Sequence, residues 1–151
     1  MDKIDCRSLM IGDWLFYRGQ YNAFPFRVEQ ITKKKVGYHA EPNETRMHYL
    51  RLCECQPIPL TSEILEKNGF EKTQIHGEKQ DDIFQCFDGE IIIEVGIYDP
   101  NFILIHYRYK TPDEINSGEL SSIVKVDGGK FYLHELQHAL RLCGIEKEII
   151  L

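Results

Sequence analysis

The sequence predicts an α+β fold that is mostly antiparallel β-sheet, and three observations lead to this prediction. Short segments that alternate apolar and polar residues recur along the chain, as they do in half-buried strands. Turn-forming residues separate these segments at short intervals, which favours hairpins over parallel crossovers. One apolar stripe with helical spacing lies near the C-terminus. With 151 residues, of which 42% are hydrophobic, the chain can bury a core without metal or disulfide support.

The first 60 residues are predicted to form a small SH3-like barrel or a curled sheet. Its strands are short, and tight turns join them. They are expected at residues 13–17, 24–31, 36–40 and 47–55. In the second of these, Phe24, Phe26 and Val28 fall on one face, which is the period of a half-buried strand. Pro25 suits the start of a strand or an edge strand.

A short helix is predicted to follow this unit, within residues 61–70. Pro57 and Pro59 are expected to end the β unit, because proline cannot donate to a paired ladder. Thr61 stands at the position of an N-cap, since its side chain can accept a hydrogen bond from the first turn. Gly69 has the place of the glycine that commonly follows the last turn of a helix.

Residues 83–151 are predicted to form a second antiparallel sheet and a C-terminal helix. The preceding residues 71–82 are polar and aperiodic, which indicates a linker or an exposed loop. Strands are expected at residues 90–98, 102–109 and 121–126. The helix is expected at residues 132–143, where regularly spaced leucines form a stripe that should pack on this sheet. The two β units can equally form one continuous domain.

The charge balance and the cysteines limit the classes of function. There are 24 acidic and 18 basic residues, and a net charge of −6 disfavours general binding to nucleic acid. The run Lys33-Lys34-Lys35 keeps a nucleic-acid-binding module open as an alternative. The five cysteines are an odd number without a Cys-x-x-Cys spacing, as expected for reduced thiols in a cytoplasmic protein. No signal peptide and no membrane association are expected.

The segment His134-Glu135-Leu136-Gln137-His138 matches the His-Glu-x-x-His motif of zinc-dependent hydrolases. On a helix both histidines would share one side and could hold zinc, while Glu135 activates a water. A third ligand is not evident, because the chain has Arg141 and Gly144 where the extended motif has glycine and a third histidine. The helical period also turns the histidines away from the leucine stripe. We therefore predict an exposed or interface-facing pair without metal.

Other candidate residues are few. We predict no catalytic residue and no cofactor, with zinc as the alternative held by His134, Glu135 and His138. His134, His138 and Arg141 are the expected contacts with a partner, which would be another protein or a second copy of the chain. A group of aromatic residues in the N-terminal unit is expected to be core rather than a platform for a ligand. This group is Trp14, Phe16, Tyr17, Tyr21, Phe24 and Phe26.

Three motifs carry a resemblance that spans most of the chain. They are Ser-Leu-Met-Ile-Gly-Asp-Trp at 8–14, Pro-Ile-Pro-Leu-Thr at 57–61 with Gly-Phe at 69–70, and Tyr-Leu-His-Glu-Leu-Gln at 132–137. In this order they resemble a family of short uncharacterised proteins from gut Bacteroidales, their phages and mobile elements. The family has no assigned activity. The positions of Glu135 and His138 can be Gln and Asn there, and either change would remove a member of the zinc site.

The sequence thus favours a non-enzymatic accessory or protein-binding protein of a phage or mobile element. Its expected location is the cytoplasm, that of the host cell if a phage encodes it. A zinc-dependent hydrolase that uses the segment 134–138 is the first alternative. A nucleic-acid-binding module is the second alternative, although nucleic acid is an unlikely partner for a chain of this charge.

Overall fold

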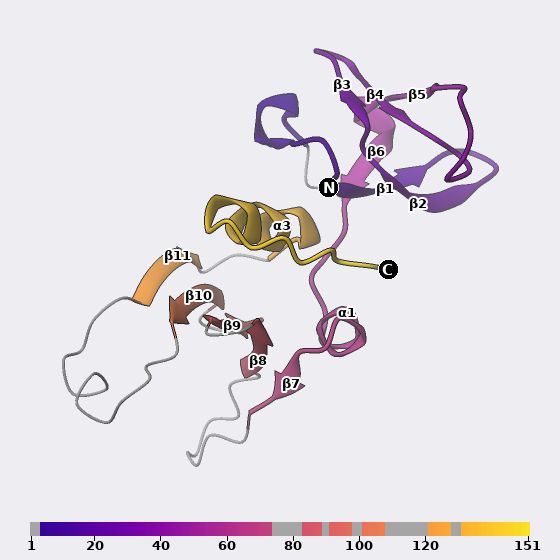
Figure 1. Cartoon of the computed structure of the whole chain (residues 1–151). Helices are drawn as coiled ribbons and strands as arrows, with labels where there is room; N and C mark the ends of the chain where they lie inside the picture. The colour runs from indigo at the N-terminus through magenta and orange to yellow at the C-terminus, as the bar shows by residue number, and fades with distance from the viewer. Residues whose placement is uncertain (1–3, 74–82, 89–90, 98–100, 108–120, 128–130) are drawn as a thin grey trace, which may run out of the picture. The chain divides into compact units, whose positions relative to one another are not determined.

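The structure is α+β, as predicted, and the paired strands that it describes are all antiparallel (Figure 1). It is a computed structural model that describes residues 4–73, 83–88, 91–97, 101–107, 121–127 and 131–151. The chain divides into two units, Met1–Pro59 with Tyr132–His138 (unit 1) and Leu60–Phe131 with Ala139–Leu151 (unit 2). Among the described residues, no helix is both long enough and apolar enough to cross a membrane.

Unit 1 contains two three-stranded sheets, ordered β2-β1-β6 and β3-β4-β5. Its elements are η1 (Cys6–Ser8), β1 (Trp14–Arg18), β2 (Ala23–Arg27), β3 (Gln30–Ile31), β4 (Lys35–Tyr38), β5 (His48–Arg51), η2 (Leu52–Glu54) and β6 (Cys55–Pro57). The predicted faces are confirmed, because Phe26 and Val28 are buried while Arg27 and Glu29 are exposed. The core consists of Leu9, Leu15, Phe26, Val28, Val36 and Cys55. An SH3-like closure of these sheets stays a prediction.

Three details of unit 1 differ from the sequence prediction. The strand expected at residues 24–31 is two short strands, β2 and β3, which belong to different sheets. Residues 47–55 are not one strand, because the 3-10 turn η2 separates β5 from β6. At this turn the Leu52 N–H donates to the Lys34 carbonyl over 2.9 Å. Pro57 was expected outside the paired ladder, but it lies opposite Leu15 at the end of β6. This position tolerates proline because β6 is an edge strand, where a missing N–H need not break a ladder.

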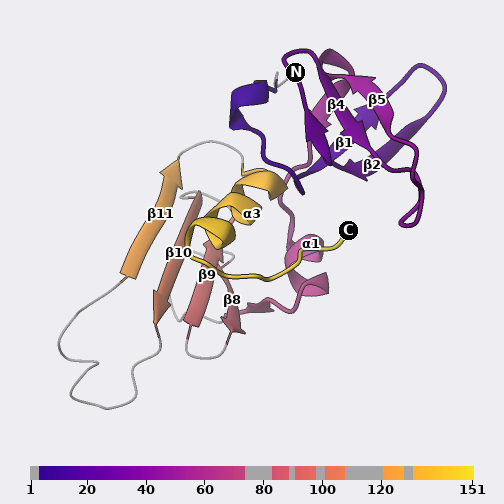
Figure 2. The same cartoon turned by 45° about the horizontal axis from the view of Figure 1, so that its top comes forward.

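Unit 2 contains one five-stranded sheet, ordered β11-β10-β9-β8-β7, whose strands β8 to β11 lie side by side in Figure 2. Its elements are α1 (Ser62–Lys67), β7 (Glu71–Lys72), β8 (Ile83–Asp88), β9 (Ile91–Gly96), β10 (Asn101–Tyr107) and β11 (Ser121–Asp127). The prediction of a loop over 71–82 is wrong at its start, because β7 pairs with β8. Residues 74–82 of that predicted loop lie outside the described residues. Strand β8 was not predicted.

The two helices end where the sequence predicts. Helix α3 (Leu133–Leu142) contributes its first residues to unit 1 and its last to unit 2. Gly69 and Gly144 have φ angles of 77° and 71°, which residues other than glycine rarely adopt. The N–H of the residue after each glycine donates to a carbonyl in the last turn, as in a Schellman motif. These bonds join Phe70 to Leu65 over 3.0 Å and Ile145 to Leu140 over 2.9 Å.

Candidate functional site

The histidines of the His-Glu-x-x-His segment are not exposed as predicted. His134 is 8% exposed, and the side chain of His138 is 17% exposed. The expected exposure is wrong because residues 132–138 belong to unit 1, where Asp13 in the segment before β1 contacts His138. The His134 ring stacks on Tyr132 at a centroid distance of 5.9 Å and meets the His138 ring edge-on at 5.6 Å. Partner contacts by His134, His138 and Arg141 stay a prediction.

Glu135 has a structural role at the start of α3. Its Oε2 atom accepts a hydrogen bond from the Tyr132 backbone N–H over 2.9 Å. Tyr132 directly precedes the helix, so this contact is the half of a capping box in which the third helical residue reaches back. The carboxylate therefore satisfies an N–H group that the helix itself leaves without an acceptor. Its negative charge also lies at the favourable end of the helix dipole.

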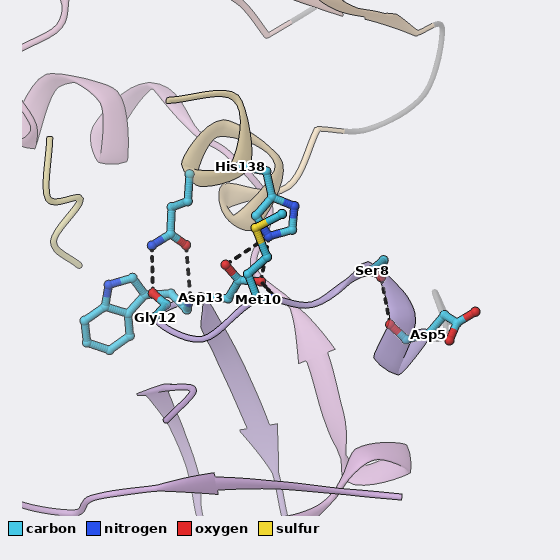
Figure 3. A network of polar contacts seen from close by, with 8 residues as sticks. Asp5, Ser8, Met10, Gly12, Asp13 and His138 are labelled. Carbon is cyan, nitrogen blue, oxygen red and sulfur yellow. Dashed lines mark hydrogen bonds and ion pairs between the residues drawn. The ribbon is translucent and has the colours of Figure 1, made fainter. Parts of the chain in front are cut away.

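His138 pairs with a fully buried carboxylate, that of Asp13 (Figure 3). Its Nε2 atom lies 2.8 Å from Oδ2 and 3.0 Å from Oδ1. The Met10 N–H also donates to Oδ2, over 2.8 Å, so that Asp13 closes the turn before β1 as well. A buried carboxylate needs such partners, because water is not available to solvate it. The pair thus links two segments that are 125 residues apart.

Gln137 adds a second link between the same two segments. Its Nε2 atom donates to the Gly12 carbonyl over 3.0 Å, and its Oε1 atom accepts from the Trp14 N–H over 3.1 Å. The side chain is 7% exposed, so both backbone groups are satisfied by the protein rather than by water. Sequence reasoning missed Asp13 and Gln137 as a pair of anchors. Both residues lie in motifs that carry the family resemblance, Asp13 at 8–14 and Gln137 at 132–137, and this position was the sequence signal that could have pointed to them.

The His-Glu-x-x-His segment does not gather a third ligand in the part of the chain that the structure describes. There, no three side chains of His, Cys, Asp or Glu are grouped so that they could hold a metal ion. The Nε2 atom of His138 is in hydrogen-bond contact with the Asp13 carboxylate. Glu135, Gln137 and His138 have polar partners within unit 1. Within the described part of the chain, by contrast, the buried His134 Nδ1 atom has no hydrogen-bond partner.

Unit 1 also carries a groove of about 700 Å³, which we call the aromatic groove. It is lined by Trp14, Phe24, Pro25, Phe26, Arg27, Glu29, Tyr38, His39, Ala40, Glu41 and Pro42. A concave site of this size that combines aromatic walls with a few polar groups is typical of ligand binding. The residues come from β1, β2, β4, the segment after β4 and, for Glu29, the residues between β2 and β3, so that paired strands hold most of the walls.

The rings of this groove pack on one another and still leave surface for a ligand. Tyr38 contacts Phe26 and Phe24 at centroid distances of 5.2 Å and 5.7 Å. Phe26 is 3% exposed and belongs to the core, as predicted. Trp14, Phe24 and Tyr38 are half-buried. Tyr21 is 91% exposed and contributes neither to the core nor to the groove. The aromatic group is therefore not only core, because part of it forms the wall of the groove.

Two of the three charged residues that line the groove are acidic. Glu29 and Glu41 line it and are exposed, beside one basic residue, Arg27. Close by, Glu44 Oε1 lies 2.8 Å from His48 Nε2, and this hydrogen bond lowers the pKa of Glu44. Burial and then the charge of Glu44 raise the pKa of Tyr38. The Tyr38 hydroxyl therefore keeps its proton well above neutral pH and stays a hydrogen-bond donor.

The basic run Lys33-Lys34-Lys35 lies at another place in unit 1. It lines a second hollow, of about 350 Å³, which shares no residue with the aromatic groove. The structure adds Arg51 to this run, a residue that the sequence analysis did not single out. Unit 1 therefore has an acidic, aromatic groove and a separate basic pocket.

The chain was compared with known proteins at three levels. No protein-family model, no curated protein and no solved structure matches it. The resemblance to the Bacteroidales and phage family accordingly stays a prediction, and the function has to be argued from the geometry of the chain itself.

Proposed function

We propose that this chain is an accessory protein that binds an extended, proline-containing segment of another protein in the aromatic groove. The observation that carries the proposal is that half-buried Trp14, Phe24 and Tyr38 line a groove of about 700 Å³. Aromatic side chains offer a large contact area and lose little conformational freedom on binding. They are accordingly frequent in surfaces that recognise peptides.

The shape and chemistry of the groove favour a polyproline II segment over a helix or a strand. Such a segment has no internal hydrogen bonds, so its carbonyl groups are available to donors on the protein. The Tyr38 hydroxyl is a donor of this type, and the rings of Trp14 and Tyr38 can pack against proline. Pro25 and Pro42 at the groove walls cannot donate to an added β-strand, which disfavours strand addition at these positions.

The charge of the groove favours a basic residue in the bound segment. Glu29 and Glu41 outnumber Arg27 among the charged residues that line it. The chain as a whole carries a net charge of −6, so that a basic partner is attracted over a longer range as well. The ligand that we propose is therefore a proline-rich segment with at least one Lys or Arg.

The family resemblance supplies a context for this binding. A phage or mobile element would use such a protein in the host cytoplasm, where it would act by binding rather than by chemistry. Hydrolysis by zinc is less well supported, because Glu135 and His138 are both engaged within unit 1. A catalytic zinc site needs these groups directed at the metal and its water.

Trp14 makes the proposal directly testable, because it is the one tryptophan of the chain. We expect its fluorescence to change on titration with a synthetic peptide of about ten residues that contains several prolines and two lysines. The control peptide has the same charges with every proline replaced by alanine. Saturable binding of the first peptide and much weaker binding of the second support the proposal. If calorimetry and fluorescence detect binding of neither peptide to the folded protein, the proposal is overturned.

A charge reversal locates the binding site. Glu41→Lys places a positive charge in the groove, whereas Glu66→Lys makes the same change on the exposed side of α1 in unit 2. We expect Glu41→Lys to weaken binding of the basic peptide by about tenfold, which is about 1.4 kcal/mol. Glu66→Lys should leave the affinity within about twofold. Equal effects of both variants would mean that the peptide does not bind in the groove.

A further inference from the structure

The second hollow of unit 1 is lined mainly by cations, and we call it the basic pocket. Its volume is about 350 Å³, and its lining residues are Ile4, Lys33, Lys34, Lys35, Arg51, Leu52 and Cys53. Ile4 and Leu52 are half-buried and pack against the core of unit 1. The pocket therefore combines four exposed cationic side chains with an apolar floor.

Backbone hydrogen bonds fix the segments that carry these cations. The Thr32 side chain accepts from the Lys35 N–H over 3.0 Å and donates to the Lys35 carbonyl over 2.8 Å, which closes the turn between β3 and β4. The Lys34 carbonyl accepts from the Leu52 N–H over 2.9 Å. The turn and the end of β5 are thus joined, and the ammonium groups extend from a defined frame rather than from a loose loop.

This arrangement is unfavourable for the protein alone. Lys35 and Arg51 are direct partners in the register of β4 and β5, and like charges at opposite positions destabilise a sheet. Within the described part of the chain, no carboxylate forms an ion pair with any cation of this pocket. In a chain with 24 acidic residues, a group of four cations that forms no ion pair with a described carboxylate is better explained by an external anion.

We propose that the basic pocket binds phosphate groups of a ligand that carries two or more of them. Lysine and arginine are the usual side chains for phosphate, and a guanidinium can bind two of its oxygens at once. Two sources have this chemistry, a free nucleotide or polyphosphate and the backbone of a single-stranded nucleic acid. The apolar floor formed by Ile4 and Leu52 would then contact the part of the ligand next to the phosphates. This site is independent of the aromatic groove and of the peptide proposed there.

The test uses two probes, inorganic tripolyphosphate and a fluorescent single-stranded oligonucleotide of about twelve nucleotides. Binding is measured by calorimetry for the first and by anisotropy for the second, at several salt concentrations. The pocket variant is Lys34→Gln with Arg51→Gln. The control is Lys67→Gln with Arg18→Gln, which removes the same two charges at exposed positions outside the pocket.

We expect the wild type to bind at least one probe and the pocket variant to bind it about tenfold more weakly, with a smaller salt dependence. The control should bind within about twofold of the wild type. Binding of both probes supports a general phosphate site, and binding of the oligonucleotide alone identifies nucleic acid as the source. Exposed Cys53 gives a second readout, because a bound ligand should slow its alkylation. No binding of either probe at low salt, or equal losses in the pocket and control variants, overturns the proposal.

Discussion

Both units of the protein use the amide of one buried side chain to fix a segment that is distant in sequence. In unit 1, Gln137 binds the backbone of Gly12 and Trp14. In unit 2, Asn68 donates to the Ile150 carbonyl over 2.9 Å and accepts from the Ile150 N–H over 2.9 Å. A side-chain amide can do this because it carries a donor and an acceptor side by side, like a peptide group in a strand.

The units differ in what surrounds this amide. Unit 1 adds the pair of Asp13 and His138, in which the carboxylate is fully buried. Unit 2 has no comparable buried carboxylate among its described residues, and Ile150 is 49% exposed. Water can therefore replace the contact in unit 2 more easily than that in unit 1. Removing the attachment of the N-terminal segment in unit 1 should therefore cost more unfolding free energy than removing that of the C-terminal tail in unit 2.

The largest effect is expected from His138→Ala. This change leaves the buried Asp13 carboxylate without its histidine partner, and such a loss typically costs about 3–5 kcal/mol of unfolding free energy. From the sequence alone, an exposed histidine would be expected, and its loss would cost little unfolding free energy. The burial of the pair changes this expectation to a large cost. Urea unfolding of the variant measures the loss. His48→Ala is the control, because the pair of His48 and Glu44 is partly exposed and should contribute much less. Equal losses would contradict the difference that we draw between buried and exposed pairs.

Substitutions of two leucines on α3 should destabilise the two units separately. Leu136 lies in the part of α3 that belongs to unit 1 and Leu140 in the part that belongs to unit 2, and they are 0% and 1% exposed. Leu136→Ala and Leu140→Ala should each cost about 2–5 kcal/mol, because each leaves a cavity in a packed core. Hydrogen exchange should show the first variant opening amides of unit 1 and the second those of unit 2. If both variants open the same amides, the units unfold together and the comparison between them fails.

The two amide anchors should differ in the same direction. Gln137→Ala leaves a buried carbonyl and a buried N–H without their partners, which costs about 1–3 kcal/mol. Asn68→Ala should cost less, because the half-exposed backbone of Ile150 can bind water instead. Thermal or urea unfolding gives the two free energies, and faster exchange at Trp14 or at Ile150 identifies the anchor that was lost. A larger loss for Asn68→Ala would contradict the ranking.

The starts of the two helices give a smaller and more local contrast. Helix α1 is capped by Thr61, whose side chain accepts from the Ile64 N–H, whereas α3 is capped by Glu135 from within its first turn. We expect Thr61→Ala and Glu135→Ala each to cost about 0.5–2 kcal/mol. Glu135→Gln should cost less, because the amide oxygen can still accept from Tyr132. A loss for Glu135→Gln as large as that for Glu135→Ala would show that the charge matters more than the hydrogen bond.

Cys55 should give the smallest effect near neutral pH. Burial, followed by the charges of Glu54 and Cys53, raises the pKa of this thiol from 9.0 to about 12. Because the folded protein holds the thiol proton more tightly, this contribution to stability is complete below pH 9.0 and is lost as the pH rises from there towards about 12. At about pH 8, iodoacetamide should modify exposed Cys53 and leave Cys55 unmodified, since the thiolate is the reactive form. Mass spectrometry of the digested protein checks this, and rapid modification of Cys55 would contradict its burial.

Features set by neighbouring residues could be predicted from the sequence. The caps at Thr61 and Gly69 and the buried face of Phe26 and Val28 depend on contacts within a few residues, and each is found as expected. The break between β5 and β6 was missed because the 3-10 turn is held by a hydrogen bond from Leu52 to distant Lys34.

The candidate sites were harder to predict because they depend on pairing across the chain. Lys33, Lys34 and Lys35 are visible in the sequence, but Arg51 joins them only through the register of β4 and β5. Glu135 and His138 have the spacing of a zinc motif, and the same spacing serves a helix cap and a hydrogen bond to a buried carboxylate. The second use depends on Asp13, which is 125 residues away from His138 in the sequence. The aromatic groove likewise needs the side-by-side arrangement of β2 and β4 residues.

Unit 1 is discontinuous in sequence, and this has a consequence for its synthesis. The chain of unit 2 between Leu60 and Phe131 separates the strands of unit 1 from the helical residues that anchor its first segment. On the ribosome, the sheets of unit 1 emerge early, while Gln137 and His138 leave the exit tunnel only after the strands of unit 2 have been made. The nascent chain must therefore carry an Asp13 carboxylate before its histidine partner is available, and the first segment of unit 1 should be fixed only after the strands of unit 2 have been made.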